Sequence, residues 1–244
     1  RICPSAAAFV DDPKAALYEI ADNGLFFESK RDFAKEMFAG LARLGGTTVG
    51  IIANRSASFD ENGETAEEFG AALTSAGCAK AASLARFCDA FEIPVVTMTN
   101  ASGFAATEAE ESTVAAAAAG LAAVFAGATV PKINVITKRA GGSAYAVMNS
   151  KALGADITLA YENATVGILE GRFAAPILCD GDAQALAQAA KDYDALQNSI
   201  DAAAARGLVD QIIAPADVRK YLIGAVEVLY SKREALPSRK HASL

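Results

Sequence analysis

The chain has 244 residues, of which 52% are hydrophobic, and its 29 acidic and 22 basic side chains give a net charge of -7. This length and apolar content can bury a sizeable core, so we expect residues 1–244 to form one domain. The acidic balance argues against a nucleic-acid partner, which requires a basic face.

The first half of the chain alternates between predicted helices and strands. A helix is expected to begin at Asp11-Asp12-Pro13 and to stop near Gly24, because an acidic cap and an early proline favour a helix start. The spacing of Phe33, Met37, Phe38 and Leu41 predicts a second helix that ends at Gly45-Gly46. The elements that follow are a strand at 49–54, an exposed polar excursion at 55–76, a helix at 79–91, a strand at 93–99, and a loop at 100–107.

An alanine-rich stretch follows that loop. Residues 112–131 carry no charge, but they contain few strongly apolar side chains and include Gly120 and Gly127. A buried, closely packed soluble helix is therefore expected rather than a membrane span. The chain also shows no leader of charged and then apolar residues, so we expect a cytoplasmic protein.

The centre of the sequence predicts a strand that turns into a helix. Ile133, Val135 and Ile136 indicate a buried strand, Gly141-Gly142 a turn, and the composition from Ser143 onward a helix. The first N–H groups of a helix lack intrahelical partners and lie at its positive end, so the amides of Gly142, Ser143 and Ala144 would stabilise an anion or an oxyanion. An ordinary strand-to-helix turn explains the same pattern.

The last third continues the alternation of strands and helices. Strands therefore recur about every 40 residues with helices between them, which is typical of right-handed βαβ crossovers in the α/β class. The expected elements are strands at 156–161 and 164–169, a helix at 183–206, an extended segment at 208–213, and a helix at 216–232.

Several segments resemble, in order, the C-terminal half of the carboxyltransferase subunit of biotin-dependent acyl-CoA carboxylases and decarboxylases. The resemblance implies a crotonase-like superhelix of stacked ββα units, an α/β fold. The resembling segments are residues 22–28, 40–54, 85–96, 128–138 and 143–156, with Leu208-Val-Asp and Pro237-Ser-Arg-Lys-His241 fitting the family's C-terminal end.

The resemblance also implies a reaction. Carboxybiotin on a carrier protein would be cleaved to CO2 and a biotin enolate, and the carboxyl group would pass to or from a coenzyme A thioester. Backbone amides among Gly142, Ser143 and Ala144 would hold the negative oxygen. The implied partners are a biotin carboxyl carrier protein and an N-terminal-type half that binds acyl-CoA, in a homo- or hetero-oligomer.

Two stretches that resemble the family's substrate site also depart from its pattern. The usual Tyr-Gly-Gly-Ala-Tyr-Asp is Gly141-Gly-Ser-Ala-Tyr-Ala146, which keeps Tyr145 but places Ala146 where an aspartate shapes the acyl pocket. The usual Asp-Val-Pro-Gly-Phe is Asn100-Ala-Ser-Gly-Phe104, which keeps Gly103 and Phe104. The resemblance therefore implies that Tyr145, Ala146, Gly103 and Phe104 bind substrate. Packing within the loop is the alternative role for Phe104.

Other functions remain open from the residues alone. A non-catalytic crotonase-like scaffold fits the two departing loops. A serine hydrolase using Ser143 would need a glycine at the position of Tyr145 and a histidine base, and the only histidine is His241, near the C-terminus. The four cysteines lack CxxC spacing and nearby histidines, so no metal site is expected. Lys138-Arg139 would either attract a carboxylate or CoA phosphates, or remain solvated.

Overall fold

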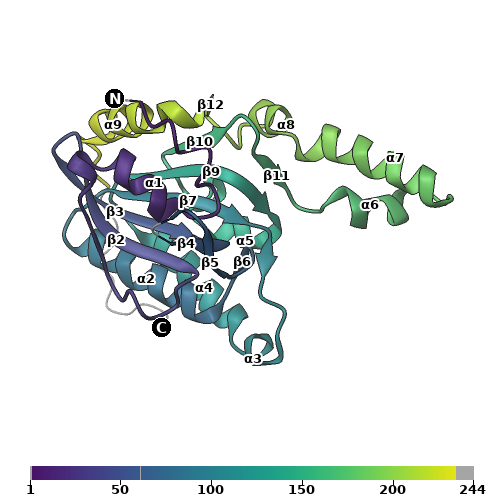
Figure 1. Ribbon diagram of the computed structural model, residues 1–244, viewed down its shortest axis with the longest axis horizontal. Coiled ribbons are helices and arrows are strands. Elements are labelled where there is room, and N and C mark those ends of the chain that lie inside the picture. Colours follow the sequence, from purple (N-terminus) through teal and green to yellow (C-terminus); the bar gives the residue numbers. More distant parts are fainter. Residues whose placement is uncertain (1, 61, 235–244) are drawn as a thin grey trace.

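A mixed eight-stranded sheet forms the centre of the fold in the computed structural model, which describes residues 2–60 and 62–234 (Figure 1). The first three strands pair antiparallel and the others pair parallel, so the sheet is mostly of the parallel type that helices cover on both faces. In spatial order the strands are β1 (Phe26–Glu28), β2 (Met37–Leu44), β3 (Thr47–Asn54), β7 (Val95–Ala101), β9 (Lys132–Gly141), β10 (Ile157–Tyr161) and β12 (Gln211–Ile213), and β11 (Thr165–Gly167) pairs with the end of β9.

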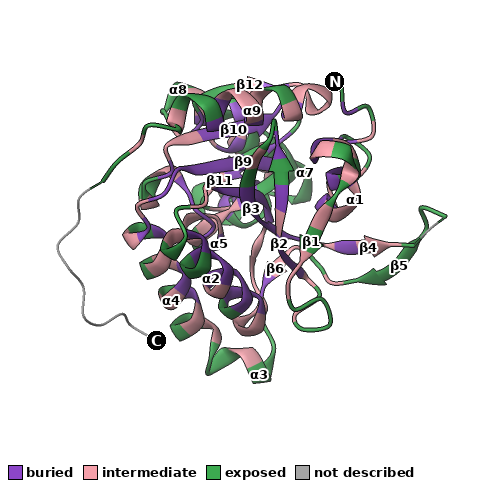
Figure 2. Ribbon diagram, turned by 90° about the vertical axis from the view of Figure 1, so that its left-hand side faces the viewer, coloured by how far each residue is buried: buried purple, intermediate pink, exposed green. Residues whose placement is uncertain are grey.

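Helices cover both faces of this sheet, and each face has its own hydrophobic core. On one face α1 (Pro13–Ile20) and α9 (Val218–Leu229) bury Leu17 and Leu222 against the sheet. On the other face α2 (Ser75–Ala90), α4 (Val114–Gly127) and α5 (Gly142–Val147) bury side chains such as Phe125. Figure 2 shows the buried residues concentrated between these layers.

Two small strand pairs and several short helical turns lie outside the main sheet. A hairpin formed by two short strands projects from the body, largely exposed (Figure 2). A second small pair joins the segment before α2 to the segment after β7. These elements are β4 (Ala57–Phe59) with β5 (Thr65–Glu68), β6 (Ala72–Leu73) with β8 (Gly103–Phe104), α3 (Glu108–Glu111), and 3-10 turns at Asp22–Gly24, Lys151–Leu153 and Pro215–Asp217.

A helical arm leaves the body after β11 and returns to it before β12 (Figure 1). The Nδ2 of Asn198 donates to the carbonyl oxygen of Leu169 at 2.8 Å and to Oδ1 of Asp194 at 2.6 Å, which ties the returning chain to the outgoing one. The arm consists of α6 (Gly171–Leu178), α7 (Ala183–Tyr193), a π-helical turn (Asp194–Asn198) and α8 (Ile200–Ala205).

Most predicted elements are confirmed, but the helix expected before Gly45-Gly46 is wrong. Residues 37–44 form β2, which lies between β1 and β3 and is buried on both faces. A strand buried on both faces has no polar alternation, so its apolar run imitates a helical stripe. The glycine pair is the turn of the β2–β3 hairpin, where both residues have positive φ (59° and 85°).

Two further helix predictions need correction. The helix predicted at 183–206 is interrupted at Ser199, which is extended and whose Oγ accepts a hydrogen bond from the amide of Ala202 at the start of α8. The helix α6 was not predicted. The alanine helix is present as α4, but only Ala118, Leu121 and Phe125 of it are buried, so its other side is open. Within the described part of the chain, no helix combines the length and the apolar character needed to cross a bilayer.

Two buried thiols predict how stability depends on pH. Burial raises the pKa of Cys78 and of Cys88 to about 12, with nearby carboxylates acting in the same direction. Because these folded-state pKa values exceed the unfolded value of about 8.5, the thiols favour the native state fully below that pH and lose this contribution as the pH rises toward 12. We expect the free energy of unfolding in urea to fall less between pH 8 and pH 10.5 in Cys78→Ala/Cys88→Ala than in the unmodified chain. An equal fall in the two proteins would contradict this assignment.

Candidate functional site

The turn between β9 and α5 has the form that the sequence predicts. Gly142 has φ = 58°, a left-handed conformation that favours glycine, and the helix continues from it through Ser143 and Ala144. Within the described residues, no side chain makes a capping hydrogen bond at the start of α5. Ser143 is exposed, whereas the Ala144 side chain is fully buried in the core beneath the helix. The turn therefore combines a glycine of positive φ with a helix start that lacks a side-chain capping hydrogen bond among the described residues.

The segment after β7 packs directly against this turn. A Cβ atom added to Gly141 would lie 3.0 Å from the carbonyl oxygen of Ser102, so a larger residue could not be placed there without moving one backbone. The α5 helix also contacts β8, which carries Gly103 and Phe104. The structure thus brings the two stretches with the expected substrate residues side by side.

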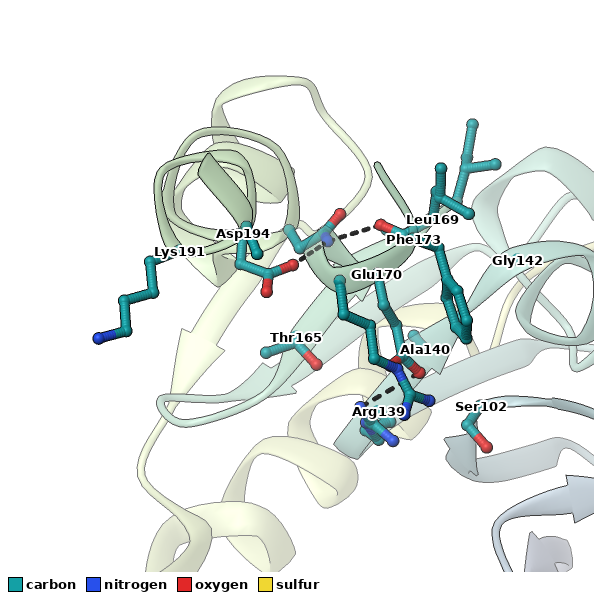
Figure 3. A pocket seen from close by; sticks show the side chains of 16 residues that line it. Ser102, Arg139, Ala140, Gly142, Thr165, Leu169, Glu170, Phe173, Lys191 and Asp194 are labelled. Atoms are coloured by element: carbon teal, nitrogen blue, oxygen red, sulfur yellow. Dashed lines mark hydrogen bonds and ion pairs between the residues drawn. The ribbon is translucent and has the colours of Figure 1, made fainter. Parts of the chain in front are cut away.

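A cavity of about 460 Å³ opens in front of the turn (Figure 3). Its inner wall is the end of β9 with Gly141 and Gly142, and its outer wall is the start and the return of the helical arm. The lining residues are Ser102, Arg139, Ala140, Gly141, Gly142, Thr165, Gly167, Ile168, Leu169, Glu170, Arg172, Phe173, Ala190, Lys191, Asp194 and Asn198.

Among the seven predicted site residues, Gly142 lines this cavity and the other six are not among its lining residues. Phe104 packs against the core under α2 and α4, and Gly103 pairs with Ala72 of β6. Tyr145 packs against the small core beside β11; its hydroxyl is buried without a hydrogen-bond partner among the described residues, and burial raises its pKa to about 12. The carbonyl oxygen of Ala146 accepts a hydrogen bond from Ser150 Oγ at 2.8 Å.

Charged side chains on the arm side of the cavity were not found by sequence reasoning. One carboxylate, that of Glu170, pairs with Arg139 at 3.3 Å and with Arg172 at 2.8 Å. The guanidinium of Arg172 also lies over the Phe173 ring, 4.5 Å from its centroid. A partial signal was available: β9 and β11 run parallel, so Arg139 near the end of β9 and Glu170 shortly after β11 lie at the same edge of the sheet.

The basic pair Lys138-Arg139 is divided by the alternation of the strand. Lys138 points away from the cavity, and its Nζ lies 2.9 Å from both carboxylate oxygens of Asp11. Burial acts to raise the pKa of Asp11, but hydrogen bonds from Ser56 and Lys138 outweigh it and hold this pKa below its usual value. Arg139 alone therefore supplies positive charge to the cavity from this dipeptide.

Asn100, at the position of the family's aspartate, lies in a buried network rather than on the cavity wall. It occupies a β-bulge of β7, its amide N–H donates to Oδ1 of Asn54 at 2.8 Å, and its Nδ2 lies 3.2 Å from Asp11 and from Ser56. The network fixes the path of the chain into Ser102. The asparagine thus supports the loop that meets Gly141.

The serine hydrolase alternative depends on two residues besides Ser143. Tyr145 stands where the elbow motif needs a glycine, and it is partly buried in the packing of α5. His241, the one histidine of the sequence, lies outside the described residues. No described side chain of the cavity lining is a histidine.

Comparisons with known proteins give one consistent family. A model of the carboxyl transferase domain matches residues 1–244. The propionyl-CoA carboxylase beta chain of Saccharopolyspora erythraea is 35% identical over 245 residues, which cover 96% of this chain and 43% of that protein. The mitochondrial beta chain of Homo sapiens is 35% identical over 233 residues, or 93% and 40% of the two chains.

Solved structures agree in fold. The crystal structure of transcarboxylase 12S, described as a hexamer assembly with methylmalonyl-coenzyme A bound, matches with a TM-score of 0.86 and 31% identity over 95% of this chain and 44% of that one. The beta subunit of P. aeruginosa geranyl-CoA carboxylase, at 20% identity and a TM-score of 0.76, matches in fold. The predicted crotonase-like α/β fold is confirmed, and the chain spans less than half the length of these relatives.

Proposed function

The chain belongs to the carboxyl transferase domain family, and from that premise we propose that it is one half of a carboxyltransferase that moves a carboxyl group between carboxybiotin and an acyl-CoA thioester. The observation that supports this most directly is the turn at Gly142, whose left-handed φ and uncapped helix start lie at the wall of an open cavity. We assign residues 1–244 to one domain of that enzyme and expect it to work in the cytoplasm.

The volume and the lining of the cavity support its assignment as the site for the ureido ring system of biotin. Its volume of about 460 Å³ lies within the range of about 300–1,000 Å³ that is usual for ligand sites. Leu169 and Phe173 supply apolar wall, and the backbone of Gly141 and Gly142 supplies polar groups without side-chain bulk. Ser143 and Ala144 would add their amides from the first turn of α5, and Tyr145, Ala146, Gly103 and Phe104 would line the neighbouring acyl site.

In the proposed reaction the ligand supplies the reacting groups and the protein stabilises the charge that develops. Carboxybiotin, when bound, supplies the carboxyl group and an oxygen on which negative charge develops. The main-chain N–H groups at Gly142, Ser143 and Ala144 would stabilise that charge, because they belong to the first turn of α5, at its positive end. A donor of this kind typically contributes about 3 to 4 kcal/mol to transition-state stabilisation.

Partners are needed because the chain spans less than half the length of its relatives. We propose that an N-terminal-type half, on the same or another chain, binds the acyl-CoA, and that a biotin carboxyl carrier protein delivers the carboxyl group. The hexamer reported for transcarboxylase 12S supports an oligomer that brings the two halves together.

Co-purification and reconstitution test this function. Isolation of the tagged chain from its native cell is expected to recover a biotinylated protein and an acyl-CoA-binding chain. Adding these partners to the purified protein should transfer labelled carboxyl from methylmalonyl-CoA to the carrier. Recovery of neither partner, together with no transfer in the mixture, would contradict the proposal.

A non-catalytic scaffold is the second candidate, favoured by the fact that six of the seven predicted site residues are not in the cavity lining. Calorimetry with biotin methyl ester separates the two functions. The carboxyltransferase is expected to bind the ester, and Gly142→Val to weaken that binding; a scaffold would give no heat in either case.

A further inference from the structure

The cavity contains a small charged cluster that the transfer chemistry described above leaves without a role. Arg139 comes from the end of β9, and Glu170 and Arg172 come from the start of the arm. The two arginines bind one carboxylate: Arg139 contacts Oε1 of Glu170 at 3.3 Å, and Arg172 contacts Oε2 at 2.8 Å. All three residues line the same cavity as Gly142 (Figure 3).

The other charged side chains of the cavity, Asp194 and Lys191, do not take part in the ion pairs of this cluster. Oδ1 of Asp194 accepts the Gly171 amide at 2.8 Å and the Asn198 Nδ2 at 2.6 Å, so that carboxylate holds the arm together. Lys191 adds a third cation on the arm side. With three cations and two carboxylates, the lining carries a net positive charge in a chain whose net charge is -7.

We propose that Arg139 and Arg172 bind the carboxylate that is transferred, and that Glu170 occupies their guanidinium groups until that ligand arrives. This inference rests on the proposed carboxyltransferase function and adds the residues that recognise the anionic group. A planar guanidinium matches a carboxylate in geometry and charge, so a ligand carboxylate can make the contacts that Glu170 makes now.

The exposure of the cluster allows this exchange. The side chains of Arg139, Arg172 and Glu170 retain 45%, 69% and 32% of their accessible surface. Ion pairs this open to water contribute little to stability, so replacing the internal carboxylate by a ligand carboxylate has a small cost. Glu170 also reduces the repulsion between the two guanidinium groups, because its carboxylate lies within 3.3 Å of both.

Two ligands carry the transferable carboxylate: a 2-carboxyacyl thioester and N-carboxybiotin. Coenzyme A is replaced by N-acetylcysteamine in the thioester probes, so that their binding does not depend on the acyl-CoA-binding half. The first pair of probes is therefore the methylmalonyl and propionyl thioesters of N-acetylcysteamine. The second pair is N-carboxybiotin and biotin, each with its side-chain carboxyl group as the methyl ester, so that the N-carboxylate of the first stays free. Within each pair the two compounds differ by one carboxylate.

Calorimetry on the whole chain at constant ionic strength gives the test. We expect at least one carboxylated probe to bind tenfold or more tightly than its uncharged pair member, and the pair that shows this preference identifies the source of the carboxylate. Arg139→Gln/Arg172→Gln is expected to reduce the preference to below twofold, and Glu170→Gln to tighten binding of the carboxylated probe about threefold or more. The control is Lys138→Gln, which removes one positive charge next to Arg139 but outside the cavity lining and should leave the preference intact; Arg139→Gln alone, which also removes one charge, should reduce it.

Three results would overturn the assignment: no preference for either carboxylated probe, a preference that survives the double arginine change, or weaker binding in Glu170→Gln. Thermal unfolding of each variant confirms that it is folded at the temperature of measurement. A preference without carboxyl transfer in the reconstituted mixture would refute the proposed function and leave the anion site standing. Transfer with an unchanged KM in the double variant would refute the anion site alone.

Discussion

Gly142→Val is expected to lower carboxyl transfer by about two to three orders of magnitude, the loss typical of one oxyanion donor. Gly142 has φ = 58°, which a β-branched residue adopts only with strain, and an added Cβ would lie 3.5 Å from the Ile168 carbonyl oxygen. We expect the peptide to turn so that this strain is relieved, which would redirect the amides at the start of α5. The measurement is the single-turnover rate of the reconstituted enzyme.

Gly46→Val is the control for backbone strain. Gly46 has φ = 85°, and no atom of the described residues lies within 4 Å of an added Cβ. It lies in the β2–β3 hairpin, at the opposite end of the parallel strands from the cavity. Both variants are expected to lose about 1 to 2 kcal/mol of stability. Only Gly142→Val should lose transfer, and equal rates in the two variants would exclude the turn from the reaction.

Asp12→Ala is expected to lower the free energy of unfolding by about 3 to 5 kcal/mol, because it leaves the buried Arg55 without its counter-charge. The guanidinium of Arg55 binds both carboxylate oxygens of Asp12, at 2.8 and 2.9 Å, and both side chains are more than 90% buried. Asp12 also accepts the Phe59 amide at 3.0 Å. Urea unfolding followed by circular dichroism measures the loss.

An exposed ion pair provides the comparison. Lys35 and Glu67 lie 3.5 Å apart with about half of each side chain open to solvent, so Glu67→Ala should cost at most ~1 kcal/mol. The double variant Asp12→Ala/Arg55→Leu should recover part of the loss, since it removes the unpaired charge as well. A loss below ~1 kcal/mol in Asp12→Ala would show that Arg55 reaches water when its partner is absent.

The turn at Gly141-Gly142 could be predicted because its signals are local. An apolar β-branched run, a glycine pair and a helical composition follow one another within the strand and helix that they specify. The β2 strand could not be recognised in this way. Its residues are apolar on both sides because β1 and β3 flank it and helices cover both faces, and that information lies in distant segments.

The cavity could be predicted only on its inner side. Gly142 was expected from the turn, whereas Glu170, Arg172 and Phe173 depend on where the arm leaves the body. Its short helix α6 contains Pro176 and several apolar residues, so its sequence resembles neither a regular helix nor a loop. The tether at Asn198 joins residues 29 positions apart, a contact that no local pattern reports.

The arm allows the shape of the cavity to vary while the buried core stays the same. The outer wall of the cavity belongs to a segment that leaves the sheet after Gly167 and is fastened again at Asn198. Insertions or deletions between these two points would widen or narrow the opening, while every buried strand kept its register. Ligand preference among relatives should therefore follow the length and sequence of this segment more closely than the overall identity of the chains.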